Sequence, residues 1–143
     1  MALDLKQVPH TPGIYKFFSK NKKNRVVLSY NWKLRSLANY IQQLEMESLG
    51  KQANPRSIFK QTGQSVFGGF GSTAQHSYFQ LLHQGTAGFC TDIIYSDSSN
   101  SPLSSAQAKG QASLLSSTFK GSSNFLEQTN SNSPVNLFHL NKL

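Results

Sequence analysis

The sequence is poor in acidic residues and contains a single cysteine. Six Asp and Glu stand against fourteen Lys and Arg in 143 residues, which gives a formal net charge of +8. Cys90 alone excludes a disulfide bond within the chain and favours an intracellular protein. The first residues, MALDLKQVPH, contain no apolar run of the secretory type, and no later run approaches the roughly 20 apolar residues that span a bilayer. We therefore expect one cytoplasmic domain without a membrane segment.

The excess of positive charge is confined to the first 60 residues. Eleven of the fourteen Lys and Arg lie there, and the rest of the chain is balanced. The densest cluster consists of Lys16, Lys20, Lys22, Lys23 and Arg25. Such a cluster attracts nucleic acid or an acidic partner, but a solvated connection explains it more simply, because no base-reading element accompanies it. We expect no nucleic acid as partner, and a basic binding module remains the alternative function.

Three β-prone runs, at 25–30, 65–67 and 90–95, alternate with two helical patterns. Asn31 is a suitable N-cap for the first helix and Gly50 a suitable end. An apolar stripe at helical spacing is expected to face a core, and it consists of Leu34, Leu37, Ala38, Ile41 and Leu44. The alternation predicts an α/β fold, a partial three-layer βαβαβ unit with a parallel sheet.

The second helical pattern follows a glycine-rich turn. Ser72 is predicted to be its N-cap, with Gln75 completing a capping box, and Gly85 is predicted to end the helix. Its apolar face is formed by Tyr78, Leu81 and Leu82.

The glycines of this turn fit a second pattern. Gly69, Gly71 and Ala74 match the G-x-G-x-x-A spacing of dinucleotide-binding turns, and Asp92 or Asp97 follows at a suitable distance. A tight strand-to-helix turn explains the glycines equally well. A P-loop is excluded because no Gly-Lys-Ser/Thr follows.

Two carboxylates and one histidine occupy positions suited to acid–base chemistry. Glu45 and Glu47 fall in the last turn of the first helix, where the helix dipole disfavours negative charge. His76 falls in the first turn of the second helix, close to the carboxyl edge of the predicted sheet, where ligands of such folds bind. The alternatives are a solvent-exposed pair of glutamates and a structural histidine. One cysteine and scattered histidines do not form a metal site, and we predict none.

The amino-acid composition changes after residue 96. Seventeen of the 39 residues from 96 to 134 are Ser or Asn, and only a weak helix is expected between about 104 and 117. Beyond residue 118 the apolar residues are too sparse to offset an ordering cost of about 1–2 kcal/mol per residue. We predict a disordered tail over residues 118–143, although the hexapeptide VNLFHL could dock locally.

Two long motifs resemble a known family. The stretch RVVLSYNWKLRSLANYIQQLEMESLGK, followed by VFGGFGSTAQHSYFQLLHQGT, closely resembles phosphoglucose isomerase, specifically part of its second sugar-isomerase-type domain. The motifs concerned are QQ-x-x-MES-x-GK and QH-x-x-x-QL-x-HQGT. We assign residues 25–117 to this partial domain. Residues 1–24, with VPHTPGIYKFF, instead resemble the start of the GIY-YIG nuclease domain of a bacterial excinuclease, and we expect an unrelated lead-in there.

The resemblance implies roles for three residues. Glu47 matches the base that moves a proton between C1 and C2 when glucose 6-phosphate and fructose 6-phosphate interconvert. His76 matches the histidine that assists ring opening and reaches the site from the neighbouring subunit of a homodimer, and Gln43 matches a substrate-binding glutamine. The resemblance implies a sugar-phosphate partner and no cofactor or metal ion.

The departures from the family pattern concern charge and phosphate binding. The sequence has no counterpart of the Gly-Gly-Arg segment, of the late lysine or of the first domain's phosphate loop. Losing an oxyanion-stabilising group costs on the order of 10²–10³ in rate. We therefore expect the chain to be a fragment that is inactive alone.

Overall fold

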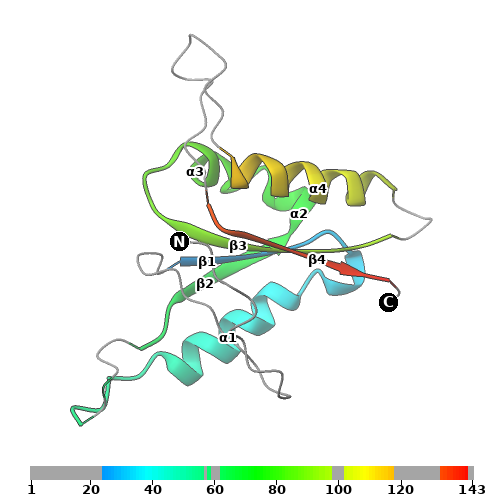
Figure 1. The fold of residues 1–143 in the computed structure, drawn as a ribbon. Helices are drawn as coiled ribbons and strands as arrows, with labels where there is room; N and C mark the ends of the chain where they lie inside the picture. Colours follow the sequence, from blue (N-terminus) through cyan, green and yellow to red (C-terminus); the bar gives the residue numbers. More distant parts are fainter. Residues whose placement is uncertain (1–23, 57, 59–61, 98–101, 118–132, 142–143) are drawn as a thin grey trace, which may run out of the picture.

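The described part of the chain is centred on a sheet of four parallel strands. A computed structural model describes residues 24–56, 58, 62–97, 102–117 and 133–141. The strands lie in the order β2-β1-β3-β4 (Figure 1). Their bounds are β1 Asn24–Ser29, β2 Ser65–Phe70, β3 Phe89–Ser96 and β4 Val135–Leu140. The three predicted strands are confirmed, and a fourth joins them.

Helices cover both faces of this sheet. α1 lies on one face, whereas α2, α3 and α4 lie on the other (Figure 1). The bounds are η2 Trp32–Leu34, α1 Leu37–Leu49, α2 Gly71–Ala74, α3 Phe79–Gln84 and α4 Pro102–Ser116. Crossovers between parallel strands are right-handed. The chain runs from β1 out to β2 and then back across β1 to β3, so the helices that follow β2 lie on the face opposite α1. The predicted three-layer α/β class is confirmed.

Alternate residues of β1 point into two separate cores. Val26 and Leu28 belong to the larger core, which packs against α2, α3 and α4. Val27 faces the other way and packs with Ala38 of α1 and Val66 of β2. All three β1 valine and leucine side chains are fully buried. Burial of one such side chain stabilises the fold by about 1.5–3 kcal/mol, so β1 anchors both layers.

The apolar stripe of α1 is only partly covered. Ala38 is buried, and Leu34, Leu37 and Ile41 are half-buried. Leu44, however, is 51% exposed, so the prediction that it faces the core is wrong. Among the described residues, the sheet packs against one side of α1 only, so the C-terminal end of the apolar stripe is exposed.

The first helix begins later than the sequence indicates. The Asn31 side chain accepts a hydrogen bond from the Lys33 backbone N–H at 2.8 Å. This cap serves the short 3-10 helix η2, whereas α1 begins at Leu37 without a side-chain cap. The predicted end at Gly50 is confirmed.

The second predicted helix is split into α2 and α3. Phe70, not Ser72, is the residue before α2, and no side-chain cap forms there. The Ser72 hydroxyl bonds instead to Oε1 of Gln107 in α4 at 3.2 Å. The predicted capping box is therefore wrong, because a contact with α4 takes the hydroxyl. Gly85 ends α3 as predicted.

Within the predicted disordered tail, Val135–Leu140 are ordered; this is the hexapeptide for which local docking was left open. These residues form β4, which pairs in parallel with β3. Val135 packs against the larger core, and the His139 ring stacks on Tyr95 with centroids 4.8 Å apart. The entropic cost of closing a loop rises only slowly with loop length. A short apolar strand can therefore pair with the sheet even when a long connection precedes it. Residues 118–132, 142 and 143, also predicted to be disordered, lie outside the described residues.

Two glycine substitutions test the packing between β1 and α2. A Cβ at Gly71 would lie 2.3 Å from the buried Tyr30 ring, whereas a Cβ at Gly110 in α4 meets no atom within 4 Å. We expect Gly71→Ala to lower the free energy of unfolding by about 1–3 kcal/mol through overpacking. Gly110→Ala should raise it by up to about 1 kcal/mol, since alanine favours the helix. Urea denaturation measures both, and equal effects would contradict the packing described.

Candidate active site

An ion-pair network joins α1 to the sheet. Arg25 Nη1 donates to Oε1 of Glu45 in α1 at 2.6 Å, and Arg25 Nε donates to Oδ2 of Asp92 in β3 at 2.6 Å. The remaining carboxylate oxygens accept from Gln64 and Asn136, at 3.0 and 2.8 Å. The side chains of Glu45 and Asp92 are only 15% and 7% exposed. Charges so buried are tolerated only when paired, so Glu45 has a structural role.

Glu47 differs from Glu45 although the two are close in sequence. Glu47 is exposed, and so is Gln43, one helical turn earlier on the same side of α1. Glu45 turns toward the amino ends of β1 and β2, where Arg25 and Gln64 lie. Glu47 therefore lies at the amino edge of the sheet with its carboxylate open to an incoming molecule.

His76 lies at the other edge of the sheet. α2 begins at Gly71, directly after the last residue of β2, and His76 follows α2 in an exposed turn. β2 has six residues. At about 3.3 Å per residue its ends are about 17 Å apart, and that length separates the edge of Glu47 from the edge of His76. The structure therefore brings Gln43 and Glu47 together but leaves His76 apart from them.

The buried Tyr30 packs against α2, and the partly buried Tyr78 lies in the turn that carries His76. Tyr30 is 2% exposed, and its ring fills the space above Gly71. Tyr78 packs its ring against Phe67 with centroids 5.2 Å apart. Burial raises the pKa of each hydroxyl to about 12. Sequence reasoning missed Tyr30, although a glycine opposite an aromatic residue at a strand end signals such packing.

The dinucleotide-binding pattern has a structural explanation in the described residues. Within the pattern, Gly71 makes room for the Tyr30 ring and Ala74 is buried in the larger core. Gly68, which precedes the pattern, makes room for the Val27 carbonyl oxygen. Asp92 is buried in the pair with Arg25. Asp97 pairs with His139 at 2.8 Å. Asp92 is therefore not available to a ribose at Gly71.

The basic cluster adds no binding site among the described residues. Arg25 is engaged by two carboxylates, and the four lysines at 16, 20, 22 and 23 lie outside the described range. Among the described residues, no group of three or more His, Cys, Asp or Glu is arranged to hold a metal ion. In the same part of the chain, no helix is long and apolar enough to cross a membrane.

The sequence model described as Phosphoglucose isomerase matches residues 6–136. The chain belongs to this family. The range of the match includes most of the segment assigned above to an unrelated lead-in. The division at residue 24 and the likeness to a nuclease domain stay predictions, because residues 1–23 lie outside the described structure.

The curated members of the phosphoglucose isomerase family that match are much longer. The glucose-6-phosphate isomerase of Idiomarina loihiensis is 39% identical over 114 residues, which cover 72% of this chain and 23% of that protein. The enzyme of the same name from Shewanella amazonensis is 46% identical over 85 residues, covering 58% and 16%. This chain therefore spans less than a quarter of the length of these relatives.

Solved structures agree with this assignment. A glucose-6-phosphate isomerase from Chlamydia trachomatis has a TM-score of 0.67 and 25% identity, over 84% of this chain and 26% of that one. A hypothetical protein from Thermus thermophilus has a TM-score of 0.61 at 17% identity, over 82% and 30%, and shares the fold alone. The roles of Gln43, Glu47 and His76 stay predictions.

The two glutamates of α1 provide a matched pair for a stability test. Glu45→Gln removes the charge from a buried pair, and we expect the free energy of unfolding to fall by about 1.5–3 kcal/mol. Glu47→Gln changes an exposed side chain and should alter it by less than about 0.5 kcal/mol. Urea denaturation at neutral pH distinguishes them. Equal losses would show that both carboxylates are structural.

The buried tyrosines predict loss of stability at alkaline pH. Both folded hydroxyls have a pKa of about 12, against 10.0 for an ordinary tyrosine. Between these values the unfolded chain releases protons that the folded chain retains, so the free energy of unfolding falls as pH rises. Denaturation at pH 9, 10 and 11 should show this slope. The double variant Tyr30→Phe/Tyr78→Phe should flatten it and the exposed Tyr40→Phe should not; an unchanged slope in the double variant contradicts the assignment.

Proposed function

We propose that this chain carries the proton-transfer part of an aldose–ketose isomerase site and that one copy cannot complete it. The observation that carries the proposal is the separation of Glu47 and His76 on opposite edges of the sheet. Both groups must reach one small sugar to act together. A base must approach within about 3 Å of the proton it removes. The two edges are about 17 Å apart, so a second polypeptide has to supply the missing partner.

Glu47 is the residue suited to the proton transfer. Its exposed carboxylate takes the proton from C2 of the open-chain aldose, which leaves an enediolate. A hydroxyl proton passes from O2 to O1, and the carboxylate returns its own proton to C1 to give the ketose. Gln43, one turn away, is placed to hydrogen-bond a sugar hydroxyl. The proposal takes these roles from the family motifs and finds support in the exposure of both side chains on one face of α1.

His76 then serves a neighbouring copy or partner, not its own Glu47. Its exposed position at the carboxyl edge leaves it accessible to another chain. This supports the homodimer that the family resemblance implies. The ligand is a sugar phosphate, and a cytoplasmic location follows from the same proposal.

The purified chain is expected to show no conversion of glucose 6-phosphate to fructose 6-phosphate. The charge-stabilising arginine and the phosphate loop of the family have no counterpart in its sequence, so both rate and substrate positioning are lost. A coupled assay of fructose 6-phosphate formation measures this. Turnover that disappears with Glu47→Gln would overturn the claim of incompleteness.

A chimera tests the role of Glu47 directly. Residues 24–96 of this chain replace the matching segment of the Idiomarina loihiensis enzyme, which supplies the rest of the protein. We expect the chimera to be active, because its first three strands and their helices are retained. Glu47→Gln should reduce kcat by about 10²–10⁴, the range for loss of a general base. The exposed Asn39→Ala, also on α1, is the control. A folded, active chimera that tolerates Glu47→Gln would refute the assignment.

A further inference from the structure

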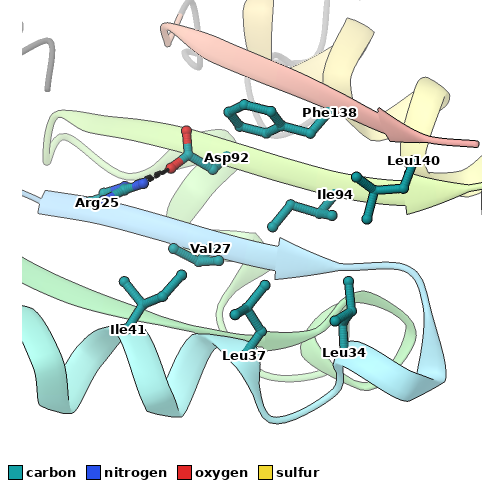
Figure 2. Close-up of a pocket in the computed structure, with 9 residues that line it drawn as sticks. All are labelled: Arg25, Val27, Leu34, Leu37, Ile41, Asp92, Ile94, Phe138 and Leu140. Carbon is teal, nitrogen blue, oxygen red and sulfur yellow. Dashed lines mark hydrogen bonds and ion pairs between the residues drawn. The ribbon is translucent and has the colours of Figure 1, made fainter. Parts of the chain in front are cut away.

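The described residues cover the α1 side of the sheet only in part. A pocket of about 370 Å³ lies on this face, between α1 and β4. Leu34, Leu37 and Ile41 form one wall, and Phe138 and Leu140 form the other (Figure 2). Parallel sheets are normally covered on both faces. We call this opening the α1–β4 groove.

The α1–β4 groove fits an apolar occupant. Its charged lining residues, Arg25 and Asp92, are bonded to each other (Figure 2). Phe138 at its rim is 48% exposed, although aromatic side chains bury more apolar area than most others. The volume of the groove lies in the range of pockets that bind a small organic molecule, so it has room for more than one large side chain.

The handedness of the connections indicates which part of the chain can lie over the groove. α1 connects β1 to β2 on one face, and α4 connects β3 to β4 in the opposite direction on the other face (Figure 1). A right-handed connection that continues outward from β4 lies on the face of α4. A right-handed connection that enters β1 from the side of β4 lies on the face of α1. The rule therefore favours residues that precede β1 over residues that follow β4.

We propose that the apolar run of residues 14–18 fills the α1–β4 groove of its own chain. The run has the sequence IYKFF and contains three aromatic side chains. It ends six residue steps before Asn24, the first residue of β1, and Arg25 lines the groove. Six steps reach at most about 20 Å. β1 itself has six residues and is about 17 Å long, so the run can reach any part of the groove.

Two further observations support this occupant. The family match begins at residue 6, so the run lies inside the matched part of the chain. On this proposal it belongs to the domain and is not an unrelated lead-in. The lysines at 16, 20, 22 and 23 are compatible with an apolar site, because a lysine stem covers apolar surface while the ammonium group stays in water.

Photo-crosslinking of the intact chain tests the proposal. p-Benzoylphenylalanine takes the place of Phe17, which keeps an aromatic ring in the run. After irradiation, mass spectrometry should locate the crosslinks on the groove walls, within residues 34–41 or 138–140. An equal mixture of unlabelled and 15N-labelled chains is irradiated, and the crosslinked peptides should share one isotope because both belong to one chain. The same photoreactive residue in place of Leu5, which precedes the family match, is the control and should give no crosslinks to the groove.

Thiol labelling measures the cover from the side of the groove. In a Cys90→Ala background, Phe138→Cys introduces a thiol in the groove. Leu137→Cys introduces one on the opposite face of β4, where Leu137 is 43% exposed. Adding Phe17→Ser/Phe18→Ser should raise the labelling rate at position 138 at least about tenfold, because two large apolar side chains no longer favour the covered state. The rate at position 137 should not change.

Four results would overturn the proposal. They are crosslinks from position 17 that lie outside the groove, crosslinks that join the two isotopes and so show a second copy in the groove, an unchanged labelling rate at position 138, and an equal rise at positions 137 and 138 in a folded chain. Circular dichroism checks the fold of each variant. The crosslinking chain keeps its aromatic rings, so it decides the question even if the serine variant does not fold. Both measurements need no substrate and are independent of the isomerase proposal.

Discussion

The ion-pair network around Arg25 joins α1 to the sheet. One guanidinium group bonds Glu45 of α1 and Asp92 of β3, and Asp92 in turn accepts a hydrogen bond from Asn136 of β4. Largely buried charges are costly unless each is paired, so β1, α1, β3 and β4 are tied to one relative position. The same network decides which polar residues are free for chemistry. Because Arg25 bonds to both carboxylates, Glu45 is not available as a base, Arg25 is not available to bind a phosphate, and Asp92 is not available to bind a dinucleotide.

The two remaining candidate residues, Glu47 and His76, are separated by the topology of the sheet. In a βαβ unit the helix runs back across the sheet, so its end lies at the edge where the strands begin. Glu47 ends α1 and lies at the amino edge, whereas His76 follows β2 at the carboxyl edge. Two residues only 29 positions apart are thereby separated by the length of a strand. A complete isomerase site built from them needs more than one polypeptide segment, which agrees with a chain that spans less than a quarter of its curated relatives.

The periodic parts of the fold were predictable from the sequence. The β-branched runs and the leucine spacing indicated three strands and α1, because burial imposes periods of 2 and 3.6 on apolar residues. Ser72 was misjudged, since its bond to Gln107 depends on a helix 35 positions later. For VNLFHL only local docking was left open, and the strand β4 could not be predicted, because its pairing depends on β3 and on the His139–Tyr95 stack. Position in α1 alone did not distinguish the two glutamates; the family motif pointed to Glu47, and the structure shows that Arg25 and Gln64 hold Glu45.

The distance between Glu47 and His76 is the central quantity of this account. It can be measured by pulsed electron spin resonance on a Glu47→Cys/His76→Cys variant in a Cys90→Ala background, spin-labelled at both sites and diluted with unlabelled chain. The length of β2 and the placement of α1 and α2 on opposite faces predict a distribution centred at about 20 Å or more within one chain. A distribution centred below about 12 Å would show that a single chain brings the two residues together, and would contradict the account.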